Sequence, residues 1–154
     1  MRSVRAHPHI ARHLLLACES FGHRLPASSV LHALDAGVRT AGLPASDLCA
    51  LTQHDGSHDT NVREVLDALD FDARMRSAHA IILGATALQE DTLAGSFAFE
   101  IATRGRQSGV PAYAVAAHNA LSSFDARILD LQKIVLARNA PALSVAGELL
   151  ARLA

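Results

Sequence analysis

"HAIILGA", residues 79–85, is the stretch that decides the fold class. Its apolar residues follow one another without alternation, which is typical of a parallel strand covered on both faces. A strand with one face in water would alternate apolar and polar residues. The stretch therefore predicts an α/β protein in which helices cover both faces of a parallel sheet.

On either side of this stretch, short apolar runs alternate with helical periods. The predicted strands cover residues 13–18, 47–52, 79–85, 111–117 and 133–137. The predicted helices cover residues 26–42, 61–69, 91–109, 122–131 and 141–154. Strands joined by helical crossovers predict an open, five-stranded, mainly parallel sheet in a three-layer sandwich, Rossmann-like or flavodoxin-like.

Composition limits the domain count and the class of partner. The 154 residues are 50% hydrophobic and 19% charged, which predicts one compact domain over residues 13–154 behind a tail at 1–12. The net charge of −1 and the lack of a basic stripe argue against a nucleic-acid partner and against a membrane surface. A small molecule or another protein is the expected partner.

The N-terminal region and the cysteines predict a cytoplasmic location. The apolar run at residues 14–17 is too short for the hydrophobic region of a signal peptide, and no segment reaches transmembrane length. Cys18 and Cys49 lie in apolar stretches without the spacing of a zinc or redox motif. We expect both to be buried free thiols.

Polar clusters follow the predicted strands. In an open parallel sheet, ligands bind outside the carboxyl ends of the strands, near the point where strand order reverses. We therefore expect these clusters to form one rim. The candidate ligand-binding residues are Glu19, Ser20, His23, Arg24, His54, Asp55, Gly56, Gly84, Gln89, Asp91 and His118.

The rim segment richest in chemistry is "HDGSHDT", residues 54–60. His54 and His58, with Asp55 or Asp59 as a third ligand, could hold a divalent metal ion if the segment were helical. Gly56 and Ser57 instead suggest a turn, in which Asp59 or Thr60 has an ordinary role as a helix cap. Asn61 is expected to cap the helix that follows. Contact with an anion or small ligand is a third interpretation, and the sequence leaves all three open.

Three stretches resemble the two-domain bacterial glycerate kinases. Residues 14–42 resemble their first strand, their Asp-Ser-Phe-Lys-Gly loop and the helix that follows it. Residues 78–117 resemble the later strand, its Thr-Gly-Glu-Gly-Arg-x-Asp-x-Gln loop and the next helix. Residues 54–60 occupy the place of the family's Ala-Asp-Gly-Gly-Glu-Gly-Thr. The resemblance extends over residues 13–137 and implies a Rossmann-like domain.

The same resemblance implies that kinase activity is absent. Only residues 67–77 stand where the family inserts its second domain. The family's loop aspartate is Glu19, and its loop lysine position is Gly22. The later loop loses most of its charge, because the positions of the family's glutamate, arginine, aspartate, glutamine and lysine are Ala85, Ala87, Gln89, Asp91 and Ser96. Phosphoryl transfer depends on such charges.

Two functions follow. The first is a glycerate kinase-like module without kinase activity, which binds a small anion or a partner protein. The alternative is a small phosphotransferase or metal-assisted hydrolase with Asp55, His58 and Asp59 as its catalytic residues. We favour the first, because a fold by itself implies no activity.

The C-terminal helix predicts a homodimer. In residues 141–154 the apolar positions cover more than the narrow stripe that one packed face requires. The surplus predicts an exposed apolar patch, and a two-fold dimer is the commonest way to cover one.

Overall fold

The computed structural model describes residues 13–52 and 61–154. Its centre is a five-stranded sheet in the order β2-β1-β3-β4-β5, and all four neighbouring pairs are parallel. The strands are β1 (Leu14–Cys18), β2 (Asp47–Ala50), β3 (Ala80–Leu88), β4 (Ala112–Asn119) and β5 (Ile134–Leu136). The predicted open parallel sheet is confirmed, and the order is that of the flavodoxin-like arrangement.

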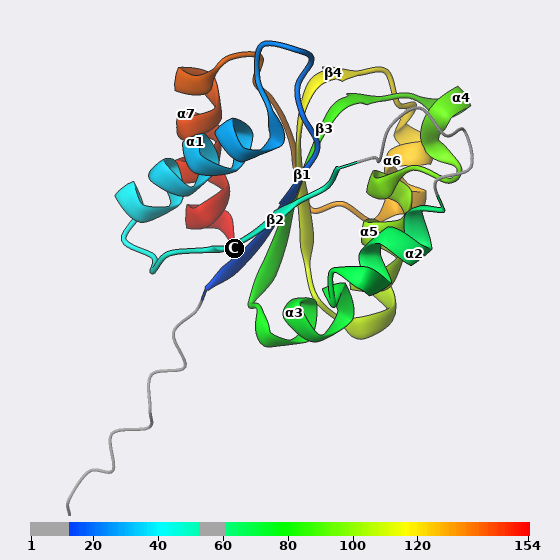
Figure 1. Ribbon diagram of the computed structural model, residues 1–154. Coiled ribbons are helices and arrows are strands. Elements are labelled where there is room, and N and C mark those ends of the chain that lie inside the picture. The colour runs from blue at the N-terminus through cyan, green and yellow to red at the C-terminus, as the bar shows by residue number, and fades with distance from the viewer. Residues whose placement is uncertain (1–12, 53–60) are drawn as a thin grey trace, which may run out of the picture.

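Helices cover both faces of the sheet, as Figure 1 shows. One face carries α1 (Ala27–Thr40) and α7 (Ala140–Leu153). The other carries α2 (Val62–Ala68), α3 (Phe71–Ser77), α5 (Phe97–Ser108) and α6 (Ser123–Leu129), with the short α4 (Glu90–Leu93) near the upper edge. Within the described residues, no helix is both long and apolar enough to cross a membrane.

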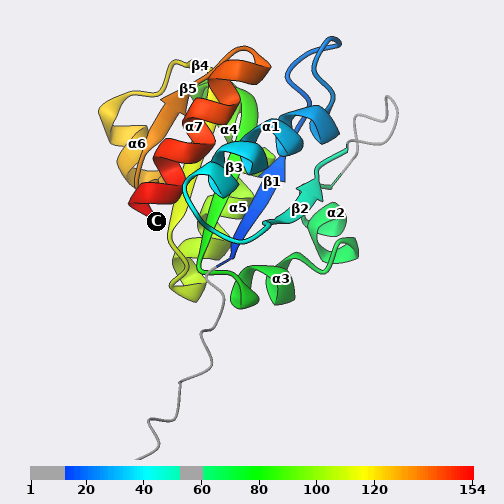
Figure 2. The ribbon, with the colours of Figure 1, turned by 90° about the vertical axis from the view of Figure 1, so that its left-hand side faces the viewer.

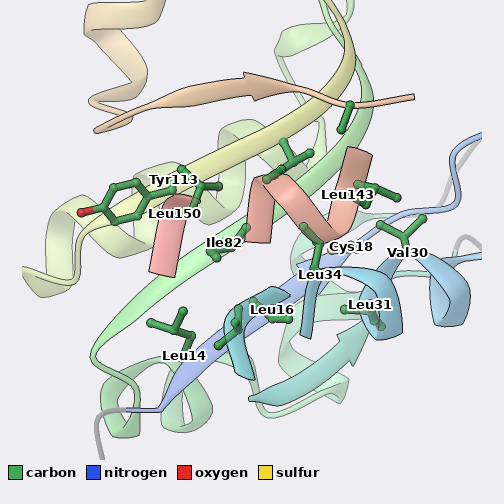
Figure 3. Close-up of a cluster of buried hydrophobic side chains, with 14 of the residues drawn as sticks. Leu14, Leu16, Cys18, Val30, Leu31, Leu34, Ile82, Tyr113, Leu143 and Leu150 are labelled. Atoms are coloured by element: carbon green, nitrogen blue, oxygen red, sulfur yellow. The ribbon is translucent and has the colours of Figure 1, made fainter. Parts of the chain in front are cut away.

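Alternation along each strand divides the buried side chains between two cores. Leu14, Leu16 and Cys18 of β1 face α1 and α7, whereas Leu15 and Ala17 face the opposite layer. Figure 3 shows the first core, where Ile82 and Tyr113 of the sheet meet leucines of both helices. The apolar run that predicts β3 is thus explained, because a strand covered on both faces has no solvent side.

The two cysteines lie on neighbouring strands but face different cores. Ala17 is the residue of β1 that pairs with Cys49, and Cys18 points to the other face of the sheet. Both thiols are buried and free, as predicted.

The backbones of α1 and α7 are in close contact at two glycines. A Cβ atom on Gly37 would meet the carbonyl oxygen of Ser144, and one on Gly147 would meet that of Leu34. The Ser144 hydroxyl donates a hydrogen bond to the Ala33 carbonyl at 2.9 Å. The two helices therefore approach more closely than side chains would allow.

The described residues contain seven helices where the sequence predicts five. Asp70, at φ 55°, separates α2 from α3, and Gly95, at φ 78°, lies between α4 and α5. The predicted single helix at 91–109 is therefore wrong at residues 94–96, where the left-handed Gly95 interrupts the helical hydrogen bonds and divides the segment into α4 and α5. The side chain of Asn61 caps α2, as predicted.

The short connection at residues 67–77 becomes part of the second helical layer. Arg74 of α3 makes a bidentate ion pair with Asp47 of β2, at 2.7 and 2.9 Å, and donates to the Leu48 carbonyl at 2.9 Å. Arg104 of α5 pairs with Asp67 and Asp72 at 3.0 and 3.1 Å. These arginines fasten α2 and α3 to the sheet edge and to α5.

Candidate functional site

The strand order opens a crevice above β1 and β3. From β1 the chain crosses one face through α1 to β2, and then returns across the other face through α2 and α3 to β3. The connections therefore diverge to opposite faces, which creates the topological switch point where ligands bind in such sheets. The Glu19 amide donates a hydrogen bond to the Gly84 carbonyl at 2.9 Å. The hydrogen bonding between β1 and β3 therefore continues up to the floor of the crevice.

A cleft of about 440 Å³ lies at this point. Its lining residues come from the carboxyl ends of β1, β2 and β3 and from the start of α1. They are Glu19, Ser20, Pro26, Ala27, Leu51, Thr52 and Thr86. The Thr86 hydroxyl donates to the Ser20 carbonyl at 2.8 Å, which holds the loop after β1 against the end of β3.

The amino end of α1 opens into the cleft. Pro26 occupies the cap position and offers no side-chain acceptor, and the first turn contains no acidic residue. The unpaired amides of a first helical turn and the helix dipole favour negative charge. This part of the cleft therefore suits an acidic group of a ligand.

Among the described residues that line the cleft, Glu19 is the titratable one. Burial at the end of β1 raises the pKa of its carboxyl to about 7, because the anion loses solvation. Glu19 also borders a second cavity of about 30 Å³, whose other lining residues are Ala85, Ala87, Leu88, Gln89, Leu93, Ser96 and Ala98. Near neutral pH this carboxyl can either donate or accept a proton.

The structure brings together part of the predicted rim. Glu19 and Ser20 line the cleft, and Gln89 lines the second cavity. Gly84 is buried beneath them, where an added Cβ would lie 2.7 Å from the Cys18 sulfur. Three further candidates are exposed and line neither cavity, namely His23, Arg24 and His118.

The remaining candidates cannot be assigned a place in the site. Asp91 belongs to α4, and the predicted ligands His54, Asp55, Gly56, His58 and Asp59 lie outside the described residues, as does the predicted tail at 1–12. Among residues 13–52 and 61–154, no group of three His, Cys, Asp or Glu side chains could hold a metal ion.

Sequence reasoning missed Thr52 and Thr86. Both hydroxyl residues lie at the carboxyl end of a strand, the same signal that identified Glu19. Thr86 falls inside β3, which is longer than predicted, and Thr52 stands at the end of the predicted second strand. A rule that counts hydroxyls as well as charges at strand ends would have found them.

Comparison with known families gives the relationship. The sequence profile of the glycerate kinase family matches residues 40–144 of the 154. The chain belongs to the glycerate kinase family. A search of curated proteins finds no match.

One solved structure supports the fold alone. A protein from Burkholderia pseudomallei described as pilus assembly-related superposes with a TM-score of 0.51 at 14% identity. The match covers 92% of this chain and 91% of that one. At such low identity the likeness extends to the arrangement of strands and helices.

In this member of the glycerate kinase family, the second cavity gathers three residues that the sequence resemblance matches to charged positions of the family. Ala85 and Ala87 of β3 and Ser96 before α5 line it beside Glu19. The Ser96 hydroxyl is occupied as a helix cap, accepting from the Phe99 amide at 3.1 Å. Of the described residues that line the two cavities, none is lysine or arginine.

Proposed function

We propose that this chain is a small-molecule-binding member of the glycerate kinase family that holds a small organic anion without phosphorylating it. The observation that carries the proposal is the cleft of about 440 Å³ at the switch point, with the uncapped amino end of α1 in its wall. A volume of this order suits a small metabolite rather than a chain segment.

The lining suggests the chemistry of the ligand. An acidic group would lie at the first turn of α1, where the helix dipole stabilises negative charge. Glu19, with its carboxyl pKa of about 7, would hydrogen-bond a ligand hydroxyl in either protonation state. A small hydroxy acid meets both requirements, and its hydroxyl can also reach Thr86.

Loss of kinase activity is supported by the charges that the cavities lack. A transferring phosphoryl group needs lysine, arginine or metal-bound carboxylates around its oxygens. The described lining offers Ala85, Ala87 and Ser96 at family positions that carry charge. One lost electrostatic donor typically costs about 3–4 kcal/mol of transition-state stabilisation, so several losses together would abolish useful turnover.

Thermal shift tests the binding proposal. We expect glycerate and related hydroxy acids to raise the melting temperature, since a ligand at 100 times its Kd stabilises a fold by about 2.7 kcal/mol. Thr52→Glu should abolish the shift by placing a carboxylate in the cleft. Ser123→Glu adds the same charge at the start of α6, outside the cleft, and should keep the shift. No shift with any small anion would refute the proposal.

An activity assay tests the second half. Purified protein with ATP, magnesium and glycerate should give no phosphorylated product above a control without protein. Turnover that is lost in Asp55→Ala would instead support the alternative function, a phosphotransferase or hydrolase that uses Asp55, His58 and Asp59.

We further propose that the protein is cytoplasmic and forms a homodimer. The two free buried thiols, Cys18 and Cys49, are consistent with a reducing compartment. The dimer is supported by the exposed apolar side chains of α7, namely Val145, Leu149 and Leu153.

A further inference from the structure

The outer face of α7 carries a continuous apolar stripe. Val145, Leu149 and Leu153 are 67%, 42% and 52% exposed, and their spacing of four residues places them along one side of the helix. Leu143 and Leu150 are buried against the sheet instead. In Figure 2, α7 lies beside α1 on the face turned toward the viewer.

A pair of opposite charges flanks the α7 stripe. Glu148 and Arg152 form an ion pair at 2.9 Å and both remain partly exposed. They lie on the flank nearer α1, because the backbone at Ser144 and Glu148 contacts Gly37 of that helix. The surface thus consists of three apolar residues in a row with one acid and one base along a single border.

We infer that a second copy of this chain packs its α7 antiparallel across this stripe, about a two-fold axis at Leu149. In that arrangement Leu149 faces its own counterpart, and Val145 faces the partner's Leu153. The inference rests on the homodimer proposed above and adds the interface, its direction and the residues that specify it.

Charge decides the direction of packing. An antiparallel two-fold brings the charged border of one α7 against the same border of the other, with the two chains running in opposite directions. Glu148 then lies beside the partner's Arg152, and Arg152 lies beside the partner's Glu148. With Leu149 on the axis, the position directly opposite Glu148 is two residues, or about 3 Å along the helix, from the partner's Arg152. Long side chains can cover this distance. A parallel pair about a two-fold along the helices would instead place the two charged borders on opposite sides of the interface, so it would lack these contacts between acid and base.

Among the residues that the structure describes, the other exposed large apolar side chains do not offer an equivalent surface. Leu136 stands singly at the end of β5 (Ile134–Leu136). Phe124 and Ile128 are 71% and 42% exposed on α6, but that helix has only seven residues. Its apolar stripe is one turn long, whereas the α7 stripe spans about two turns of a fourteen-residue helix. Phe124 therefore serves as a matched control position.

Light scattering coupled to size-exclusion chromatography tests the interface over a concentration series up to 200 μM. The wild-type protein should approach twice the 16.3 kDa mass of one chain. Leu149→Glu should give a monomer, because two carboxylates would meet on the axis, while Phe124→Glu should stay dimeric. Circular dichroism and melting curves establish that both variants are folded.

Two further variants test direction and contact. Glu148→Arg should weaken dimerisation at least tenfold, and the double change Glu148→Arg with Arg152→Glu should restore it. Leu149→Cys should form a disulfide-linked dimer under a mild oxidant while Phe124→Cys does not, since both natural cysteines are buried.

The outcomes separate this inference from the ligand proposal. A monomer at 200 μM would overturn both the dimer and its interface. The α7 stripe would then be a surface for a different protein. A dimer that survives Leu149→Glu would overturn the interface alone. Thermal shift with hydroxy acids is measured on the same variants, because the cleft lies at the carboxyl edge of the sheet and should bind its ligand in either case.

Discussion

Between α1 and α7 there is no room for an added methyl group, whereas the carboxyl ends of β1 and β3 leave a cleft of about 440 Å³. In the helix layer, Gly37 and Gly147 face backbone atoms of the opposite helix. At the sheet edge, threonine hydroxyls and a half-buried carboxyl face open space. Both regions adjoin the same sheet, one on its face and the other at its carboxyl edge.

The difference shows where this chain can change and where it cannot. Close-packed backbones allow few substitutions, because a misplaced atom forces whole helices apart. Residues around a cleft can be replaced with little loss of stability, and their replacement alters what the cleft binds. Ala85 and Ser96, which the sequence resemblance matches to charged family positions, lie in the second region.

The largest effect should come from Gly147→Ala in the helix layer. Its new Cβ would collide with the Leu34 carbonyl, and we expect a loss of about 3 kcal/mol in the free energy of unfolding by urea. His32→Gln, on the exposed side of α1, should change it by less than about 0.5 kcal/mol. Equal effects would mean that the two helices can separate freely.

Glu19→Gln tests the opposite region. Because the folded carboxyl has a raised pKa of about 7, the folded state holds its proton more tightly than the unfolded state, whose pKa is near 4.5. Stability from this group is present below pH 4.5 and is lost as pH rises toward 7. We expect Glu19→Gln to exceed the wild type by about 3 kcal/mol at pH 8 and to come close to it at pH 4.5. Urea unfolding at both pH values measures this, and a deficit at pH 8 would contradict it.

Arg74→Lys probes the link between the second helical layer and the β2 edge of the sheet. The change keeps the charge but loses the bidentate contact with Asp47, which lies at the start of β2. Since both side chains are partly exposed, the expected loss is about 1–2 kcal/mol. Arg76→Lys, on the same helix and exposed, is the control and should have no measurable effect.

Thr86→Val should have the smallest effect on stability and a clear effect on binding. It removes the hydrogen bond to the Ser20 carbonyl from an exposed position, which costs about 0.5–1 kcal/mol. Binding of a hydroxy acid, measured by calorimetry, should weaken by at least fivefold, because the loop after β1 and a cleft hydroxyl change together. Unchanged affinity would place the ligand elsewhere.

Much of the fold could be predicted from local patterns. The uninterrupted apolar residues of β3, the apolar period of α1 and the cap at Asn61 each reflect forces within a few residues of chain. The number of helices could not be predicted in this way. Nothing in the sequence around Asp70 indicates its φ of 55°, which separates α2 from α3. In addition, α3 is held in place by the contact of Arg74 with Asp47, 27 residues away.

For the site, the sequence by itself determined which residues follow the strands and therefore share the carboxyl edge, since parallel strands bring those ends together. Glu19 and Ser20 were predicted on that ground. Only the tertiary structure decided that Thr52, Thr86 and the start of α1 form the walls, and that burial raises the Glu19 pKa. Strand order and the spacing between layers set these features, and both arise from contacts between residues far apart in the chain.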